Sequence, residues 1–297
     1  MLATDSENLR LHLQLAHFNQ RRLRPGLPSA EWRQELSAAL DAQLLEGEFI
    51  EAERARFAEA WPELPSEAEA FMAWFEQLKD AGPGQNHLLF SWLATTASRE
   101  QMRWFITQEV AGEAGFDDLV ACAQVRLPVR AKLEMARNYW DEMGRGHEEG
   151  MHGGLLERLV VELALKPTIE STVWQSLALA NLMVALACNR RYAWQALGAL
   201  GVIEMTAPGR VSKVNDGLRR LGVSPAGRSY FQLHAGLDVR HSEAWNREVI
   251  RPLVQARPEL ARPIAEGAWL RLNCGARCFE RYSDELGCAD ALLKKAA

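Results

Sequence analysis

Hydrophobic residues recur at steps of three and four along most of the chain, and this period predicts helices. The clearest row runs from Phe231 to Trp245, with His234, Asp238 and His241 between the two aromatic residues on the same helical face. No segment offers a pair of strands that could form a sheet. We therefore expect an all-α fold.

The first 80 or so residues predict helices without a cluster of metal ligands. Leucines alternate with polar residues at positions 9–15, but no partner strand is evident, so residues 1–26 are expected to begin a helix or to form an extended arm. Ser29 is a plausible N-cap for an amphipathic helix that runs to Trp61. A further helix is expected over residues 66–79. We interpret all of these segments as scaffold.

Length and composition define the class of protein. The chain has 297 residues, of which 48% are hydrophobic, so it can bury a large core. Residues 1–85 are expected to pack as extra helices on a bundle formed by residues 86–297, in one compact domain. The net charge is −5, and no basic run is interleaved with aromatic residues, which argues against a nucleic-acid partner.

The longest apolar run is Leu177–Cys188, whose helix would be apolar almost all round and therefore central in the domain. It contains Asn181 and is too short and too polar to cross a bilayer, so no membrane partner is expected. The N-terminus has no signal pattern, and the five cysteines lack CxxC spacing, which argues against disulfides and a thiolate zinc site. We expect a cytoplasmic protein.

The row from His234 to His241 carries the first candidate chemistry. Two imidazoles and a carboxylate cost free energy to bury unless they are paired, and a divalent metal would satisfy all three groups. The alternative is a pair of core histidines that hydrogen-bond to Asp238. The spacing alone does not decide between these interpretations.

Two further candidates lie on one predicted helix that begins near Ser98, where Gln101 completes the pattern of a capping box. Glu109 falls on the apolar stripe of this helix, and Glu113 follows one turn later. Either carboxylate can instead be a solvated helix residue.

Glu142 and His152 flank a segment with three glycines at positions 144–150. Glycines disfavour a continuous helix, so the chain is expected to open or kink there and to let both side chains reach one ion. Asp141 and His147 compete for these positions, and we rank them lower. A plain helix–loop–helix with a solvated acidic pair is the alternative.

Glu204 lies in an apolar segment, among Leu200, Val202 and Ile203. A glutamate in such surroundings is either paired or neutral. A helical hairpin could bring it to His234, which is 30 residues further along the chain. Glu204 is therefore another candidate ligand.

Several segments together resemble a known family: NHLLFSW, FITQEVAGEAGFDDL, NYWDEMGRGHEEGMH, ALGVIE, GLRRLGV and YFQLHAGLDVRH. They are similar to the iron-containing redox enzymes with a haem-oxygenase-like fold, also called haem-oxygenase-like diiron oxygenases. The resemblance spans roughly residues 86 to 250. It implies a haem-oxygenase-like helical bundle that holds two irons.

The resemblance also implies a ligand set. The family uses a first-helix glutamate, a histidine on the following core helix, a later glutamate and an H-x3-D-x2-H run, and some members add a glutamate before the first histidine. The corresponding positions here are Glu109 or Glu113, His152, Glu204, then His234, Asp238 and His241, with Glu142 as the added glutamate. Glu109 and Glu113 compete for the first position, and we favour Glu109 for its place on the stripe.

The activity implied by the resemblance is reductive activation of O2 at a ferrous pair, with oxidation of a small organic substrate. Carboxylates and imidazoles suit Fe(II), and Mn(II) is an alternative ion. The substrate class would include fatty acids, amino acids and amines. The resemblance does not identify the electron donor, and it leaves a homodimer open.

We expect a mostly hydrophobic substrate cavity. Its expected lining comprises Tyr139, Trp140, Phe231, Trp245 and residues 177–186. A polar anchor for a substrate could be Arg137, Arg145 or Arg240, but an arginine near the end of a bundle is more often solvated.

Other classes of protein stay open. Cofactor-free bundle enzymes similar to thiaminases or pyrroloquinoline-quinone synthase bind heterocycles without metal, but they would leave the ligand set unexplained. A haem enzyme is disfavoured because HLQLAHF shows no evident proximal-histidine pattern, and a non-enzymatic helical binding protein is the remaining alternative. Metal content separates an oxygenase, with about two irons, from a binding module with none.

Overall fold

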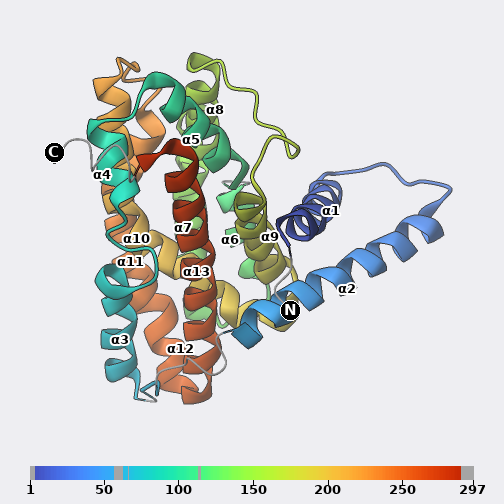
Figure 1. Cartoon of the computed structure of the whole chain (residues 1–297). Coiled ribbons are helices and arrows are strands. Elements are labelled where there is room, and N and C mark those ends of the chain that lie inside the picture. Colours follow the sequence, from blue (N-terminus) through green and yellow to red (C-terminus); the bar gives the residue numbers. More distant parts are fainter. Residues whose placement is uncertain (1–3, 57–62, 66, 113–114, 289–297) are drawn as a thin grey trace.

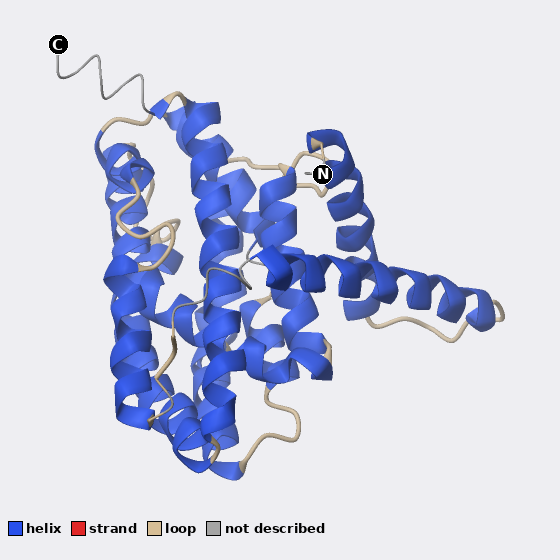
Figure 2. Cartoon of the chain, turned by 60° about the horizontal axis from the view of Figure 1, so that its bottom comes forward, coloured by secondary structure: helices blue, strands red, loops and turns tan. Residues whose placement is uncertain are grey.

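The structure is a computed structural model, and it describes residues 4–56, 63–65, 67–112 and 115–288. Every regular element in these ranges is helical (Figure 2). The one β-type pairing there is an isolated antiparallel bridge between Met143 and Met151. The expected all-α class is confirmed. None of the helices in the described ranges combines the length and the hydrophobicity that a bilayer span requires.

The elements follow one another along the chain as shown in Figure 1. The α-helices are α1 (Asp5–Leu23), α2 (Trp32–Arg56), α3 (Ala68–Ala81), α4 (Leu88–Thr95), α5 (Arg99–Gly112), α6 (Phe116–Ala123), α7 (Val129–Glu142), α8 (His152–Glu162), α9 (Trp174–Cys188), α10 (Ala193–Arg220), α11 (Ser229–Trp245), α12 (Arg251–Ala256) and α13 (Ala261–Leu286). Short 3₁₀ turns occupy 144–146, 148–150, 190–192 and 258–260, and a π-helical turn joins α11 to α12.

The centre of the bundle is α10, which packs along both α11 and α13. Glycines permit the close approach of α10 and α13: a Cβ at Gly198 would overlap the carbonyl of Ile264, and a Cβ at Gly267 would overlap the carbonyl of Gln195. The apolar helix α9 is buried on nearly every side and packs against α13, α5 and α6, so its predicted central position is confirmed. This arrangement leaves α7, α8, α10 and α11 around one cavity.

The N-terminal segment forms a helix, so the extended-arm alternative is wrong. Thr4 caps α1 in a reciprocal capping box with Glu7, which makes helix the favoured state of a segment whose leucines alternate. The next helix, α2, begins at Trp32, slightly later than the pattern suggests, and the Ser29 hydroxyl accepts a hydrogen bond from the Glu31 amide. The expected end of that helix at Trp61 lies outside the described residues.

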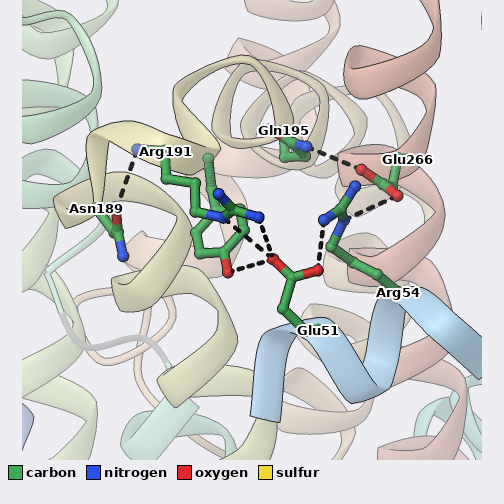
Figure 3. A network of polar contacts seen from close by, with 7 residues as sticks. Glu51, Arg54, Asn189, Arg191, Gln195 and Glu266 are labelled. Carbon is green, nitrogen blue, oxygen red and sulfur yellow. Dashed lines mark hydrogen bonds and ion pairs between the residues drawn. The ribbon is translucent and has the colours of Figure 1, made fainter. Parts of the chain in front are cut away.

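The C-terminal half of α2 is fastened to the bundle by ion pairs and hydrogen bonds (Figure 3). Glu51 accepts from Tyr192 Oη at 2.8 Å and pairs with Arg54 at 2.6 Å, and Arg54 in turn reaches Glu266 of α13 at 3.0 Å. Two residues after Glu51, Glu53 pairs with Arg277 of α13 at 2.7 Å. These contacts join the N-terminal helices to the same helix that borders the cavity.

The N-terminal half of α2 extends away from the bundle (Figures 1 and 2). Its outer face exposes a row of apolar side chains that are 50 to 63% accessible: Trp32, Leu36, Leu40 and Leu44. Beside it, α1 packs on α9. The division of the chain at residue 85 stays a prediction.

Candidate metal centre

A tight loop brings Glu142 and His152 together. Met143, after Glu142, forms the antiparallel bridge with Met151, before His152, so the ten-residue separation closes to 2.6 Å between Glu142 Oε2 and His152 Nδ1. Gly144 has φ of 60°, and a Cβ there would collide with the backbone of Gly150. The expected opening of the chain at these glycines is therefore confirmed.

The three residues His234, Asp238 and His241 are all buried on one face of α11, as their spacing predicts. Nδ1 of His234 lies 2.8 Å from the carbonyl oxygen of Tyr230, one turn earlier. Nε2 of His241 lies 3.1 Å from Oδ2 of Asp141 on α7. These bonds orient the rings and make Nε2 of His234 and Nδ1 of His241 the nitrogens suited to bind a metal.

Glu204 enters the same cavity from α10 and is 3% exposed. Its Oε1 accepts a hydrogen bond of 2.6 Å from Nδ2 of Asn138, and its Oε2 lies 3.5 Å from Nδ1 of His241. The helical hairpin of α10 and α11 thus brings Glu204 to the histidines of α11. Of the two states expected for Glu204, paired or neutral, the structure shows a paired carboxylate.

The ligand atoms form two groups that share one residue. Glu142, His152 and His234 offer atoms within 4.8 Å of one another, and so do Glu142, Glu204 and His241. Asp238 belongs to neither group, but it lines the same cavity and is 3% exposed. Glu142 therefore offers its carboxylate to either group.

The two imidazoles nearest to Glu142 differ in charge. Burial lowers the pKa of His152 to about 4, and the positive charge of His241 lowers it further, against the carboxylates of Glu204 and Asp141. Burial also disfavours charge on His241, but hydrogen bonds and charges of Glu204 and Asp141 outweigh it and raise the pKa of His241 to about 9. A metal at Nδ1 of His241 would have to replace that proton.

The residues present fit a divalent metal ion. Glu142, Glu204 and Asp238 are three buried carboxylates in one cavity, and a divalent ion would offset their charge. His152 Nδ1 and Glu142 Oε2 lie in contact, yet His152 Nδ1 has no partner in hydrogen-bond geometry among the described residues. Two donor atoms that converge without hydrogen-bond alignment are arranged as co-ligands of one ion. The donor set contains only oxygen and nitrogen, which suits Fe(II) and Mn(II).

Comparisons with known proteins agree with this donor set. A sequence profile described as "Iron-containing redox enzyme" matches residues 103–276, more than half of the chain. The chain belongs to this family. Its family identity gives the coarse class of activity, an iron-containing oxidoreductase, and no curated protein sequence matches the chain.

Two crystal structures of a CADD-like protein of unknown function from Nostoc punctiforme PCC 73102 share the fold of this iron-containing redox enzyme. One matches with a TM-score of 0.59 and 16% identity, over 74% of this chain and 98% of that chain. The other matches with a TM-score of 0.55 and 18% identity, over 75% and 96% of the two chains. The likeness confirms the expected helical-bundle architecture.

Of the two competing glutamates, the structure places Glu109 away from both ligand groups of this family member. Helix α5 packs on α9, and its Phe105 meets Tyr282 of α13 edge-on. The Glu109 carboxylate lies near Tyr282, because its charge is, after burial, the next largest cause that raises the pKa of the Tyr282 phenol. Glu113 lies outside the described residues. Among the described residues, α7 is the first helix in sequence that supplies a glutamate to either ligand group, through Glu142.

The sequence pattern ranks Asp141 below Glu142 as a candidate ligand. In the structure, Asp141 is a hydrogen-bond partner of His241. Its carboxylate holds Nε2 of His241 and also pairs with Arg145 at 2.6 Å. The competing His147 belongs to neither ligand group. Asp141 lies off the helical face that carries Glu142, as the helical period requires. The side of α7 that carries Asp141 nevertheless contacts α11.

The cavity in front of the ligands has a volume of about 120 Å³. The expected helix α9 lines it, through Leu179 and Met183, but the other expected side chains do not. Trp245 is buried elsewhere and donates to the carbonyl of Leu197 at 3.2 Å, and Trp140 is 54% exposed. Sequence analysis also missed Arg271 of α13, which lines the cavity. Only the packing of α13 against α10 reveals it.

Proposed function

We propose that this protein is a diiron oxygenase or oxidase, which activates O2 to oxidise a small organic substrate. The observation that carries the proposal is the pair of ligand groups that share Glu142. A single ion could occupy only one of these groups, so the histidine nitrogens of the other group would be left without a metal. Family membership supports iron as the metal.

In this proposal, Glu142, His152 and His234 hold one ion, while Glu142, Glu204 and His241 hold the other, and Asp238 is available to either. When bound, ferrous iron would supply the electrons and the open coordination positions that O2 requires. The chain itself would orient the ligands through Asp141, Asn138 and the carbonyl of Tyr230.

The walls of the cavity support a reaction in dry surroundings. Leu156, Leu179, Met183 and Ile203 line it beside the ligands, so a bound substrate would exclude water from the ligand cluster. A polar substrate without an apolar part would leave these walls poorly matched. This favours an organic substrate over a purely inorganic one.

Metal counting and O2 uptake test the proposal together. Protein loaded anaerobically with excess Fe(II) and then desalted should retain about two irons per chain. On mixing with O2, the iron-loaded protein should consume O2, whereas metal-free and Mn(II)-loaded samples serve as controls for iron chemistry. Retention of no iron, or iron-loaded protein that leaves O2 untouched with and without candidate substrates, would favour a cofactor-free enzyme or a binding protein.

A further inference from the structure

Arg271 is a positive side chain in the wall of the ligand cavity, on a helix that supplies no ligand. It lies on α13 between Leu270 and Leu272, which are 1% and 3% exposed, and is itself half-buried. Its Nε is buried and has no hydrogen-bond partner in the described part of the chain. A buried guanidinium N–H without an acceptor costs free energy unless a ligand supplies one.

A second guanidinium lies close enough to Arg271 to feel its charge. Arg210 of α10 lies nearby: burial lowers the pKa of Arg210 to about 9, and the charge of Arg271 lowers it further. Glu109 acts in the opposite direction on Arg210. The two guanidinium charges repel each other, and an anion bound at Arg271 would reduce this repulsion.

The chain also makes room for the guanidinium. A Cβ added at Gly275, one turn along α13, would lie 2.8 Å from Nη1 of Arg271. Glycine at this position lets the Arg271 side chain lie along its own helix without a clash. The guanidinium is therefore accommodated in the wall and not forced out into solvent.

The three arginines expected from the sequence do not line this cavity. Arg137 is paired with Glu134 and its side chain is 70% exposed, and Arg145 is paired with Asp141 and is 62% exposed. Arg240 lines a separate, open groove on the other side of His152. Among the described residues, Arg271 is the arginine that faces the cavity of the ligands.

The volume and the walls limit the anion. An apolar cavity of about 150 Å³ in another protein holds one benzene molecule, and this cavity measures about 120 Å³. The same cavity contains Glu142, Glu204 and Asp238, which would repel an anionic group placed beside them. A ligand with its anionic group at Arg271 and its apolar part against Leu179 and Met183 satisfies both conditions.

We infer that Arg271 anchors the carboxylate of a small monocarboxylate substrate, either a short aliphatic acid or a single-ring aryl acid. The inference deepens the proposed function and rests on it, since the anchored acid would be the compound that is oxidised. A planar guanidinium matches a carboxylate with two parallel hydrogen bonds, which a lysine or a glutamine cannot reproduce.

Calorimetric binding of matched probes tests the anchor without turnover. The probes are benzoate and butyrate, each compared with its amide, and the protein is studied in the anaerobic Fe(II)-loaded form and in the metal-free form. The wild type should bind each acid about 10- to 100-fold more tightly than the amide. Arg271→Gln should remove this preference by weakening only the acids, and Arg271→Lys should retain part of it.

Arg240→Gln is the matched control and should keep the wild-type preference, because Arg240 lies outside the cavity. Circular dichroism and iron content of Arg271→Gln should equal those of the wild type, since α13 supplies no ligand. The anchor is rejected if the wild type binds neither acid, if acid and amide bind equally, or if folded Arg271→Gln keeps the preference. Selective acid binding by a protein that retains no iron would support the anchor and count against the proposed function.

Discussion

The N-terminal helices and the bundle both bury histidines, but in opposite electrostatic surroundings. His12 of α1 is 2% exposed, stacked on Trp174 with ring centroids 5.8 Å apart and met edge-on by Phe49 at 4.8 Å. Burial lowers its pKa to about 4, and the positive charges of Arg277 and Arg56 lower it further. His241 of α11 is 8% exposed, yet two carboxylates raise its pKa to about 9.

The difference teaches that burial alone does not mark a metal ligand. The imidazole of His12 is neutral, packs between aromatic rings and has an amide neighbour, Asn181, whose Nδ2 lies 3.5 Å from Nδ1. The imidazole of His241 belongs to a group with Glu142 and Glu204. A histidine becomes a candidate ligand when the fold adds carboxylates that need a cation.

The largest expected effect is the loss of both ions on removal of the shared carboxylate. Glu142→Ala should retain less than about a tenth of the wild-type iron, because both ligand groups lose a member. His234→Ala should retain more iron than Glu142→Ala, since it takes a ligand from one group only. The measurement is iron content after anaerobic loading and desalting.

His12→Gln is the control from the other region and should load iron like the wild type, because His12 belongs to neither group. Equal iron contents in Glu142→Ala and His12→Gln would remove the distinction between the two kinds of buried histidine. Equal losses from Glu142→Ala and His234→Ala would mean that Glu142 is not shared.

Part of this contrast could be predicted from the sequence. The period of the helix places His234, Asp238 and His241 on one face, and the glycines after Glu142 indicate the turn to His152. These are local relations, and local geometry depends on spacing and on backbone freedom. The helical class followed from the same periodicity.

The remaining features depend on which helices meet, and spacing does not determine that. The stripe of α5 carries Glu109 toward Tyr282 because α5 packs on α9 and its Phe105 contacts Tyr282 of α13. Asp141 reaches His241 from a part of α7 that lies off the face of Glu142, and Arg271 enters the cavity from the last helix. Each of these side chains is a polar residue of a predicted helix. It would be solvated if the helical face that carries it pointed outward.

The second prediction uses the opposite pKa shifts of the two histidines in metal-free protein. His12 has a pKa near 4 when folded and about 6.5 when unfolded, so its stabilising effect is complete above pH 6.5 and is lost as the pH falls toward 4. The loss should amount to about 2 to 3 kcal/mol. His241 has a raised folded pKa, so its effect is complete below pH 6.5 and is lost as the pH rises toward 9.

Urea unfolding of metal-free wild type, His12→Gln and His241→Gln between pH 4.5 and 8.5 measures both effects. The difference in unfolding free energy between wild type and His12→Gln should shrink as the pH falls below 6.5. The difference between wild type and His241→Gln should instead shrink as the pH rises above 6.5. Differences that change in the same direction would mean that the two sites do not have opposite electrostatic surroundings.

The smallest expected effect concerns Asp141, which has no counterpart beside His12. Its carboxylate holds Nε2 of His241 at 3.1 Å, so it fixes the ring with Nδ1 toward Glu204 and strengthens that nitrogen as a donor. Asp141→Asn keeps the size and an acceptor oxygen but removes the charge, so iron affinity should fall about 10- to 100-fold. Competition with a chromogenic chelator measures this change.

Arg145→Gln is the control, because it removes the other partner of Asp141. The side chain of Arg145 is 62% exposed, and exposed ion pairs contribute little, so this variant should change iron affinity less than about 3-fold. If both variants weaken iron binding equally, the charge of Asp141 acts on the loop through Arg145 and not on the His241 ring.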